Sequence, residues 1–143
     1  MTEKYRVVTN AIITNRGKIL IGKKEEKEGH PISGEWHFPG GHVDGGEEPE
    51  EALKREVKEE TDLDVEVHQL VDVTSNTGSD SPFQVIYHVE ADSEEAEAKD
   101  DLEEIRWVDP ADIKEELDET YSERIGDREE IKKIIERIEK APY

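Results

Sequence analysis

The sequence predicts an α/β fold of the α+β type, in which helices pack on a mixed β-sheet. Short segments rich in β-branched residues recur along the chain, one helix lies near its centre, and one or two helices close it. This order departs from the regular strand–helix alternation of a doubly wound sheet, and no internal repeat is present. The chain of 143 residues is long enough for a modest core, so a single domain over residues 1–143 is expected.

The chain opens with a predicted β-hairpin. Residues 5–13 are rich in β-branched side chains and predict a strand. Residues 14–17, Thr-Asn-Arg-Gly, are typical of a turn, and residues 18–22 predict the returning strand. The charged residues 23–35, broken by Gly and Pro, are expected to form a loop, for which a lid over a site and a solvated loop are equal alternatives.

A glycine turn then leads into the central helix. Residues 36–38 form a short apolar segment before Pro39-Gly40-Gly41, where adjacent glycines let the backbone turn tightly or approach a ligand. Pro49 suits the first turn of a helix, which is expected to run to about Thr61. The apolar residues of this segment lie on one side, towards the core: Ala52, Leu53 and Val57.

The second half of the chain contains more strands. Residues 64–74 alternate in polarity and predict a strand with a bulge near Gln69. Residues 76–82 are turn-rich, and residues 83–89 predict the next strand. A short strand is expected around residues 105–108, after an acidic stretch at 92–101.

Two helical segments close the chain. Asp109-Pro110 is a typical helix start and predicts a helix over residues 110–117. A second, amphipathic helix is expected near the C-terminus and should pack over the sheet. Its isoleucines follow helical spacing: Ile131, Ile134, Ile135 and Ile138.

The charge balance is strongly acidic, with 39 Asp and Glu against 19 Lys and Arg and a net charge of −20. Such a surface repels nucleic acid and anionic membranes, so neither is an expected partner. Screening in a salt-rich cytoplasm would remove the penalty, and the 32 % hydrophobic content fits a halophilic protein. A merely acidic mesophile and a thermophile remain as alternatives. Apolar periodicity argues against disorder everywhere except in residues 92–101.

Residue usage also restricts chemistry and location. The absence of cysteine excludes disulfides, thiolate metal sites and a cysteine nucleophile. Residues 1–24 carry charges throughout and contain no long apolar run, so neither a signal peptide nor a membrane span is expected. The predicted location is therefore the cytoplasm.

Carboxylates gather on the predicted central helix. Glu56, Glu59 and Glu60 are three and four positions apart, which makes them neighbours on one helix face. Crowded carboxylates repel one another unless a cation neutralises them. Oxygen-only ligands suit a hard divalent ion, Mg²⁺ or alternatively Mn²⁺, and such ions commonly bridge phosphate oxygens. A metal-assisted phosphate site is the first functional inference.

The segment from Gly41 to Leu63 resembles the Nudix box, the signature of the Nudix hydrolases. Gly41, Arg55, Val57 and Leu63 match independently of the abundance of glutamate, and the lead-in Trp36 to Gly41 is similar too. The resemblance implies the three-layer α/β/α sandwich of that family. The box positions that match are Gly41, Glu47, Arg55, Glu56, Val57, Glu59, Glu60 and Leu63.

One box position departs from the pattern. Asp62 stands where the family normally has a glycine, just before the final aliphatic residue. That glycine would end the helix in a left-handed conformation, which aspartate tolerates less well than glycine but better than most residues. The change lies at the helix end rather than on the metal face, so little effect on chemistry is expected.

The resemblance implies Mg²⁺-dependent hydrolysis of a diphosphate linkage in a nucleoside diphosphate derivative, with water attacking phosphorus. Arg55 would orient Glu47, which has a structural role, and Glu59. The general base can lie in the box or in a later loop, where Glu103 and Glu104 are candidates; a role in an acidic surface is the alternative for both. The implied catalytic residues are Arg55, Glu56, Glu59 and Glu104; the implied metal site is Gly41, Glu56, Glu59 and Glu60; and the implied substrate-binding residues are Trp36, Gly40, Gly41 and His42.

Several side chains near the glycine turn have two interpretations. His37 and His42 could contact phosphate or ribose, or could simply pack in the core or at the surface. Trp36 and Phe83 could stack on a base or belong to the core.

The substrate stays open between a nucleoside triphosphate, ADP-ribose and a nucleotide sugar. The ADP-ribose subgroup carries a proline downstream of the box, and Pro82 lies in that region at a different spacing. The expected partner is a small-molecule nucleotide, and a homodimer is left open. Lack of cysteine argues against the isomerase that shares the fold. The alternative function is a non-catalytic nucleotide-binding or regulatory Nudix module, but such modules usually lose box glutamates or the arginine.

Overall fold

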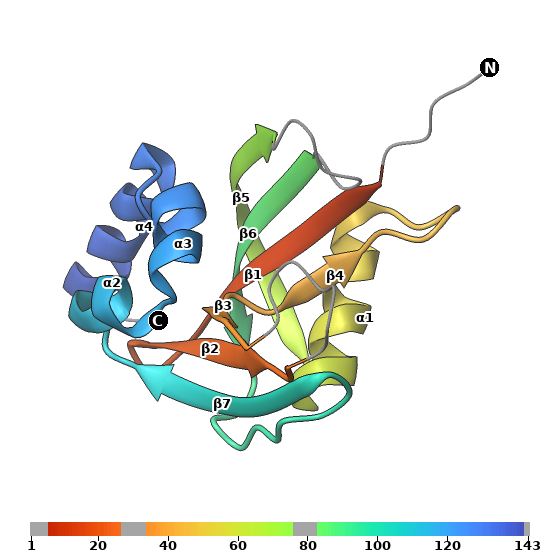
Figure 1. Cartoon of the computed structure of the whole chain (residues 1–143), viewed down its shortest axis with the longest axis horizontal. Coiled ribbons are helices and arrows are strands. Elements are labelled where there is room, and N and C mark those ends of the chain that lie inside the picture. Colours follow the sequence, from red (N-terminus) through yellow and green to blue (C-terminus); the bar gives the residue numbers. More distant parts are fainter. Residues whose placement is uncertain (1–5, 27–33, 76–82, 142–143) are drawn as a thin grey trace.

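A computed structural model describes residues 6–26, 34–75 and 83–141 of the chain. Three expectations of the sequence lie partly or wholly outside these residues: the start of the first strand at Tyr5, most of the loop 23–35, and the turn 76–82 with Pro82. The elements, in order, are β1 Val7–Asn15, β2 Lys18–Lys24, β3 Trp36–His37, β4 Gly40–His42, α1 Pro49–Thr61, β5 Val65–Ser75, β6 Phe83–Ala91, β7 Leu102–Val108, η1 Pro110–Asp112, α2 Ile113–Glu116, α3 Glu119–Tyr121, η2 Ser122–Gly126 and α4 Glu129–Lys140 (Figure 1).

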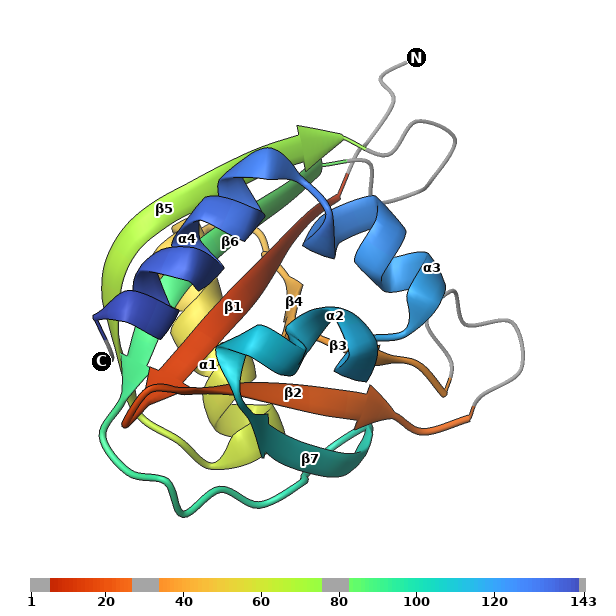
Figure 2. The same cartoon turned by 90° about the vertical axis from the view of Figure 1, so that its left-hand side faces the viewer.

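The strands form one mixed sheet, as predicted. Its main path runs β3-β2-β1-β6-β5, while β4 pairs with β1 and β7 pairs with β2. β1 and β6 are parallel and in register from Val7 opposite Phe83 to Thr14 opposite Glu90, whereas the other pairs are antiparallel. β5 therefore lies at one end of this path, on the outside of the molecule in Figure 2.

Helices cover both faces of the sheet and make the predicted α/β/α sandwich (Figures 1 and 2). On one face, α1 packs Leu53 and Val57 against Ile13 and Val89. The other face is covered by the C-terminal helices, and here the predicted isoleucine stripe of α4 packs on the sheet. This second core cluster includes Ile12, Ile21, Ile86, Ile113, Tyr121, Ile125, Ile131, Ile134 and Ile138.

The first hairpin turns more tightly than predicted. β1 extends to Asn15, which pairs with Lys18, so Thr14 and Asn15 belong to the strand rather than to the turn. Arg16 and Gly17 alone make the turn, with φ of 50° and 78°. Positive φ at both central residues is the requirement of a type I′ turn, whose twist matches that of the strands it joins.

β5 contains the predicted bulge and a second one. The register with β6 shifts between Val67 and Gln69, as expected, and again between Leu70 and Asp72. At the second shift Val71 packs on the core beneath α4. Asp72, which follows it, pairs with Arg128 at the start of α4, with a distance of 2.6 Å between Oδ2 and Nε. Bulges redirect side chains in this way, because an extra residue in the strand shifts the alternation of the side chains after it between the two faces of the sheet.

The C-terminal half differs most from expectation. β7 begins at Leu102, three residues before the expected strand, and the segment 110–117 forms a 3₁₀ turn followed by the short helix α2. The sequence-based prediction missed α3 and the π-helical turn η2. Among the described residues, no helix combines the length and apolar character needed to cross a membrane.

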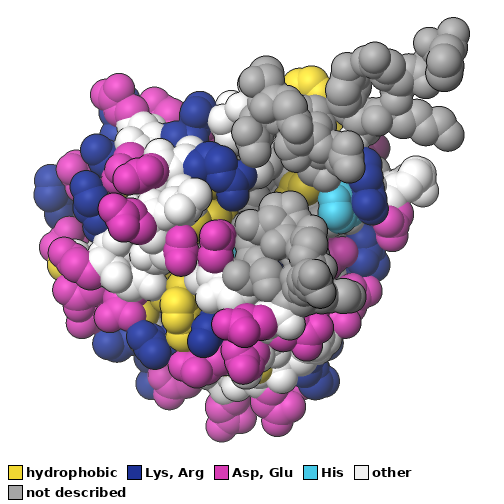
Figure 3. Space-filling model, viewed as in Figure 1, with side chains coloured by type: hydrophobic (Ala, Val, Ile, Leu, Met, Phe, Trp, Pro, Cys, Tyr) yellow, Lys and Arg dark blue, Asp and Glu magenta, His cyan; other side chains and the backbone are white. Residues whose placement is uncertain are grey.

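The acidic segment 92–101, where composition left disorder open, is held against the end of α1. The amides of Glu97 and Lys99 donate to the carbonyls of Thr61 and Glu60 at 3.0 and 2.9 Å. These bonds satisfy carbonyls that a helix end leaves without intrahelical partners. The Trp107 indole N–H also donates to the Glu94 carbonyl at 3.0 Å. Figure 3 shows carboxylates spread over the visible face of the molecule, with lysine and arginine side chains among them.

Candidate active site

The helix α1 carries the carboxylate cluster and has the predicted bounds. Pro49 occupies its first turn, and Asp62 caps its end with φ of 65° while its amide donates to the Lys58 carbonyl. The left-handed conformation that the family's glycine would supply is thus adopted by aspartate. α1 buries Leu53 and Val57 on the sheet, so Arg55 and the glutamates around it lie on an adjoining side, next to β4.

Arg55 is the centre of the cluster. Its Nε and Nη2 donate to both carboxylate oxygens of Glu47 at 2.8 and 3.0 Å, and its Nη1 donates to Glu56 at 3.0 Å and to Glu59 at 3.2 Å. Nη2 also donates to the His42 carbonyl at 3.1 Å, which ties the helix to β4. The predicted contacts of Arg55 with Glu47 and Glu59 are present, and the contact with Glu56 is an addition. Charge-assisted, bidentate hydrogen bonds of this kind hold the carboxylates in a defined orientation and also stabilise the contact.

The two glycines at the start of β4 are required by close packing. A Cβ at Gly40 would lie 1.9 Å from the Thr9 carbonyl oxygen, and one at Gly41 would lie 2.3 to 2.6 Å from the Glu56 carboxylate. The Gly40 amide donates to Glu60 Oε1 at 2.9 Å. A side chain at Gly40 would force β4 away from β1, and one at Gly41 would displace the Glu56 carboxylate, so the glycines let the carboxylates of α1 reach the strand backbone.

Glu60 is the most deeply placed carboxylate of the cluster, with 2 % of its surface exposed. Burial, together with the charges of Asp101 and Glu56, raises its pKa to about 9, although the bond from the Gly40 amide works in the opposite direction. Glu60 and Asp101 share a side-chain hydrogen bond. Burial opposes ionisation of Asp101 as well, but the Lys24 ammonium and Glu60 outweigh it and hold the pKa of Asp101 below its usual value. Without a cation, Glu60 therefore carries the proton and Asp101 the charge.

The donor set fits a hard divalent cation. Burial first, and then the neighbouring Glu59 and Asp100, raise the pKa of Glu56 despite its bond to Arg55. Two half-buried or buried carboxylates whose charge is disfavoured are what a divalent ion would stabilise, and oxygen is the ligand Mg²⁺ takes. Within residues 6–26, 34–75 and 83–141, however, no three acidic or histidine side chains are grouped to hold a metal. Arg55 donates hydrogen bonds to Glu56 and Glu59, and Glu60 accepts one from the Gly40 amide, so the three carboxylates do not converge on one point.

Of the remaining residues considered for the site, His42 contacts Arg55, whereas Trp36, His37 and Phe83 have other surroundings. The half-buried Trp36 packs against the core, with the Arg106 guanidinium 4.5 Å above its ring. His37 is buried against Tyr121, in line with the packing interpretation, and Phe83 is 43 % exposed on β6 rather than in the core. His42 lies on β4 and contributes its carbonyl to Arg55.

The two candidates for a general base on β7 are engaged in surface ion pairs. Glu104 pairs with Arg106 at 3.3 Å and Glu103 with Lys23 at 3.7 Å, and both carboxylates are more than half exposed. Asp101, just before β7, is the residue of this segment that contacts the carboxylates of α1.

Asp101, Lys24 and Asp44 were missed by the sequence reasoning. Asp44 lies 3.4 Å from Arg55, and its amide donates to Glu47 at 2.9 Å. Lys24 at the end of β2 pairs with Asp101. Asp44 lies within the box, in the turn before α1, whereas only the pairing of β2 with β7 brings Lys24 to Asp101, which in turn meets Glu60.

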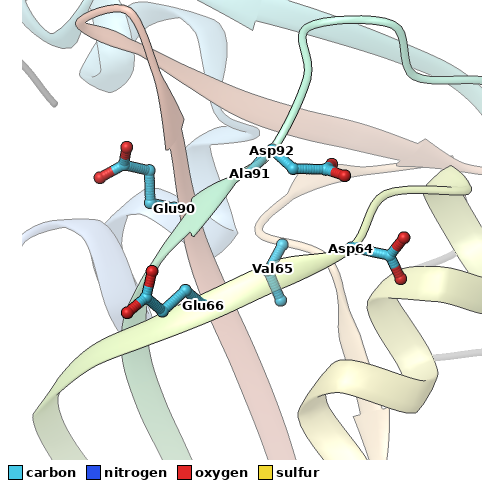
Figure 4. A pocket seen from close by; sticks show the side chains of 6 residues that line it. All are labelled: Asp64, Val65, Glu66, Glu90, Ala91 and Asp92. Atoms are coloured by element: carbon cyan, nitrogen blue, oxygen red, sulfur yellow. The ribbon is translucent and has the colours of Figure 1, made fainter.

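The hollow at the far end of β5 and β6 is separate from this cluster. It has a volume of about 300 Å³ and is lined by Asp64, Val65, Glu66, Glu90, Ala91 and Asp92. In Figure 4 the carboxylates of Glu66 and Glu90 lie to one side of Val65, and those of Asp64 and Asp92 to the other. Glu66 and Glu90 are directly opposite each other in the strand register, where like charges repel.

Comparison with known proteins places this geometry in a family. The NUDIX domain family matches residues 4–128. A protein named ADP-ribose pyrophosphatase from Methanocaldococcus jannaschii is 34 % identical over 116 residues, covering 75 % of this chain and 67 % of that protein. The nucleoside triphosphatase NudI of Escherichia coli is 26 % identical over 122 residues, covering 77 % of this chain and 86 % of NudI.

Solved structures agree on the fold. A NUDIX hydrolase from Nitrosomonas europaea superposes with a TM-score of 0.76 at 19 % identity, covering 99 % of this chain and 76 % of that one. The MutT protein from Methanosarcina mazei gives 0.71 at 19 % identity, with 96 % of both chains covered. The family generally uses a divalent metal ion, and its members act on small nucleotide substrates. With an arginine-centred carboxylate helix set against a glycine turn, this chain belongs to the Nudix hydrolase family and is a pyrophosphohydrolase.

Proposed function

We propose that this Nudix hydrolase cleaves the diphosphate linkage of a nucleoside diphosphate derivative at a Mg²⁺ site held by α1, with Mn²⁺ as an alternative ion. The observation that carries the proposal is the contact of Glu56 and Glu60 with the backbone of Gly40 and Gly41. This contact places two carboxylates, whose raised pKa values show that their ionised forms are disfavoured, beside a strand backbone that carries no side chains. Glu56, Glu59, Glu60 and the Gly41 carbonyl are the groups proposed to hold the ion.

The bound ion would neutralise charge on the diphosphate and promote attack of water on phosphorus. The residues of the chain prepare for it. Arg55 holds Glu56 and Glu59 in place through Nη1, while its other nitrogens fix Glu47. Glu60 must lose its proton before it can act as a ligand, and Asp101 shares a hydrogen bond with it. Asp101 therefore supports a change of protonation at Glu60, and ion binding should release a proton.

Three carboxylates are candidates for the general base. Glu104, as inferred from the sequence, and Glu103 are ion-paired at the surface. Asp101 is ionised and shares a hydrogen bond with Glu60. This position next to a proposed metal ligand favours Asp101 over Glu103 and Glu104 as the general base. Loss of turnover at saturating Mg²⁺ in Asp101→Asn but not in Glu104→Gln would assign the base to Asp101, and the reverse result would assign it to Glu104.

The substrate class rests on the printed activities of relatives. One relative is named for ADP-ribose and another for nucleoside triphosphates, and both compounds contain a nucleoside diphosphate. We infer that the substrate of this chain is one of these or a nucleotide sugar. A metal-bound site of this kind also offsets the repulsion between a nucleotide and a chain with a net charge of −20.

The decisive experiment measures nucleotide or phosphate release from nucleoside triphosphates, ADP-ribose, nucleotide sugars and dinucleoside polyphosphates, with Mg²⁺ or with EDTA, at 0.1 and 2 M KCl. We expect turnover of one class only with the metal, and its loss in the Glu59→Gln, Glu60→Gln double variant. Glu136→Gln, an exposed carboxylate on α4, is the matched control and should retain full activity. Activity that survives the double change would refute the metal-site assignment. Silence across the panel in a folded protein would favour a nucleotide-binding module.

A further inference from the structure

A second hollow lies among the C-terminal helices and shares no residue with the carboxylate cluster of α1. It has a volume of about 450 Å³ and is bounded by α2, α3 and η2, of which Figure 2 labels α2 and α3. Leu117 and Ser122 are the buried residues of its lining, each with 4 % of its surface exposed, so they form its floor. The walls are charged side chains: Lys114, Glu115, Glu119, Glu123 and Asp127. We call this site the α2–η2 hollow.

The hydroxyl group on the floor of the α2–η2 hollow is unpaired. In the part of the chain that the structure describes, no group donates a hydrogen bond to Ser122 Oγ or accepts one from it. A buried hydroxyl without a partner costs free energy, so it calls for a partner that the fold itself does not supply. Ser122 also begins the π-helical turn η2, and such turns are frequent at functional sites.

Gly126 keeps the space beside this floor free. A Cβ at Gly126 would lie 3.1 Å from Ser122 Oγ and 3.4 Å from Leu117 Cδ1, which is closer than side-chain atoms usually approach. The φ of Gly126 is not positive, so the backbone conformation does not require a glycine here. The missing side chain therefore serves the space next to Ser122 and Leu117.

The walls of the hollow are acidic and only partly neutralised. Lys114 Nζ lies 3.6 Å from Asp127 Oδ1. The other three carboxylates have no ion-pair partner among residues 6–26, 34–75 and 83–141: Glu115, Glu119 and Glu123. Within the same described ranges, no three acidic or histidine side chains are grouped closely enough to hold a metal ion. A cation that fits here is therefore larger than a metal ion and carries its charge at more than one place.

We propose that the α2–η2 hollow binds a small organic diammonium ion, an alkyl chain with an ammonium group at each end. One ammonium group donates a hydrogen bond to Ser122 Oγ, and the alkyl chain packs on Leu117. The second ammonium group pairs with the carboxylates of the wall that lack a partner. A neutral ligand of the same length leaves these carboxylates unneutralised, and an anion is repelled by them. The proposal does not depend on the metal site of α1.

The test is isothermal titration calorimetry of the full chain with 1,4-diaminobutane in 0.15 M KCl, where charge interactions are screened beyond about 8 Å. The wild type should bind one diamine per chain. Ser122→Ala should raise Kd by at least about tenfold, because a hydrogen bond to a charged group is lost. Without ligand, this variant should melt at or above the Tm of the wild type, since it removes an unpaired buried hydroxyl. Gly126→Ala should also weaken binding, because its methyl group enters the space beside Ser122.

Two glutamine variants separate this site from diffuse attraction to a chain with a net charge of −20. Glu123→Gln should weaken binding, whereas Glu66→Gln, which makes the same change of charge in the hollow of β5 and β6, should bind like the wild type. Equal weakening by both, or a Ser122→Ala variant with the Kd of the wild type, would overturn the proposal. Absence of diamine binding would overturn it too, as would equally tight binding of 1,4-butanediol or displacement of the diamine by equimolar Mg²⁺.

Discussion

Glu60 offers a direct test of the site, because burial keeps it protonated and should make the metal-free protein less stable as the pH rises. Its pKa rises from 4.5 to about 9 on folding, so the folded protein holds a proton that the unfolded chain releases above pH 4.5. The sign follows from linkage: the contribution of Glu60 to stability is fully present below pH 4.5 and is lost as the pH rises towards 9. Each pH unit in that window lowers the free energy of unfolding by about 1.4 kcal/mol.

Replacing Glu60 by Gln removes this dependence and retains an oxygen to accept from the Gly40 amide. Relative to the wild type, the variant should gain about 4 kcal/mol between pH 5 and pH 8. For a chain of this size, a gain of that order raises Tm by on the order of 10 °C. The stabilised variant should nonetheless have lost Mg²⁺-dependent turnover.

The assay is thermal unfolding of wild type, Glu60→Gln and Glu136→Gln at pH 5 and pH 8, each with EDTA and with Mg²⁺. At pH 8 with EDTA, Glu60→Gln should melt well above the wild type, and at pH 5 the difference should shrink. Mg²⁺ should raise the Tm of the wild type and of Glu136→Gln but leave that of Glu60→Gln nearly unchanged. A Glu60→Gln variant that melts below the wild type at pH 8, or with the same difference at both pH values, would refute the account of Glu60.

Four further outcomes are expected. Glu66→Lys should raise the free energy of unfolding by about 0.5 kcal/mol, because it replaces a like-charge pair with Glu90 by an oppositely charged pair. Urea unfolding at low salt measures this gain, and its absence would contradict the effect assigned to the cross-strand pair. Asp62→Gly should add about 0.5–1 kcal/mol by relieving its left-handed backbone, at unchanged turnover; a loss in urea melts would contradict this. Burial, then His68 and Arg137, lower the pKa of His88 from 6.5 to about 4, so its contribution to stability is present above pH 6.5 and lost as the pH falls towards 4; His88→Gln should flatten that decline in pH-dependent melts. Molar KCl should raise Tm by screening the net charge of −20, and a Tm that KCl leaves unchanged or lowers would count against salt adaptation.

The sequence predicts those parts of the molecule that depend on local spacing. The bounds of α1 follow from Pro49 and the apolar side of the helix, and the carboxylate cluster follows from separations of three and four residues. The first bulge of β5 was visible as a break in alternation near Gln69. The mixed sheet and the sandwich also agree with prediction, since the order of strands and helices restricts the layers they can form.

What the sequence does not reveal depends on tertiary contacts. Lys24 meets Asp101, and Asp101 meets Glu60, only in the fold in which β7 pairs with β2, and nothing in their neighbours in the sequence distinguishes them from other surface charges. The close packing at Gly40 and Gly41 likewise becomes visible only with Thr9 and Glu56 in place. α3 and η2 are a different case, because a signal was present: Leu117, Tyr121 and Ile125 are four residues apart and all enter the core.

The parallel pairing of β1 with β6 has a consequence for how the protein folds. Val7 lies opposite Phe83, so the pairing closes a long loop of chain that contains both hairpin strands, the glycine turn, α1 and β5. Closing such a loop loses chain entropy before its contacts compensate, which makes the step slow. Until it occurs, no complete sheet exists for α1 to cover, and the glutamates of α1 stay hydrated. Assembly of the reaction centre should therefore coincide with the rate-limiting step of folding.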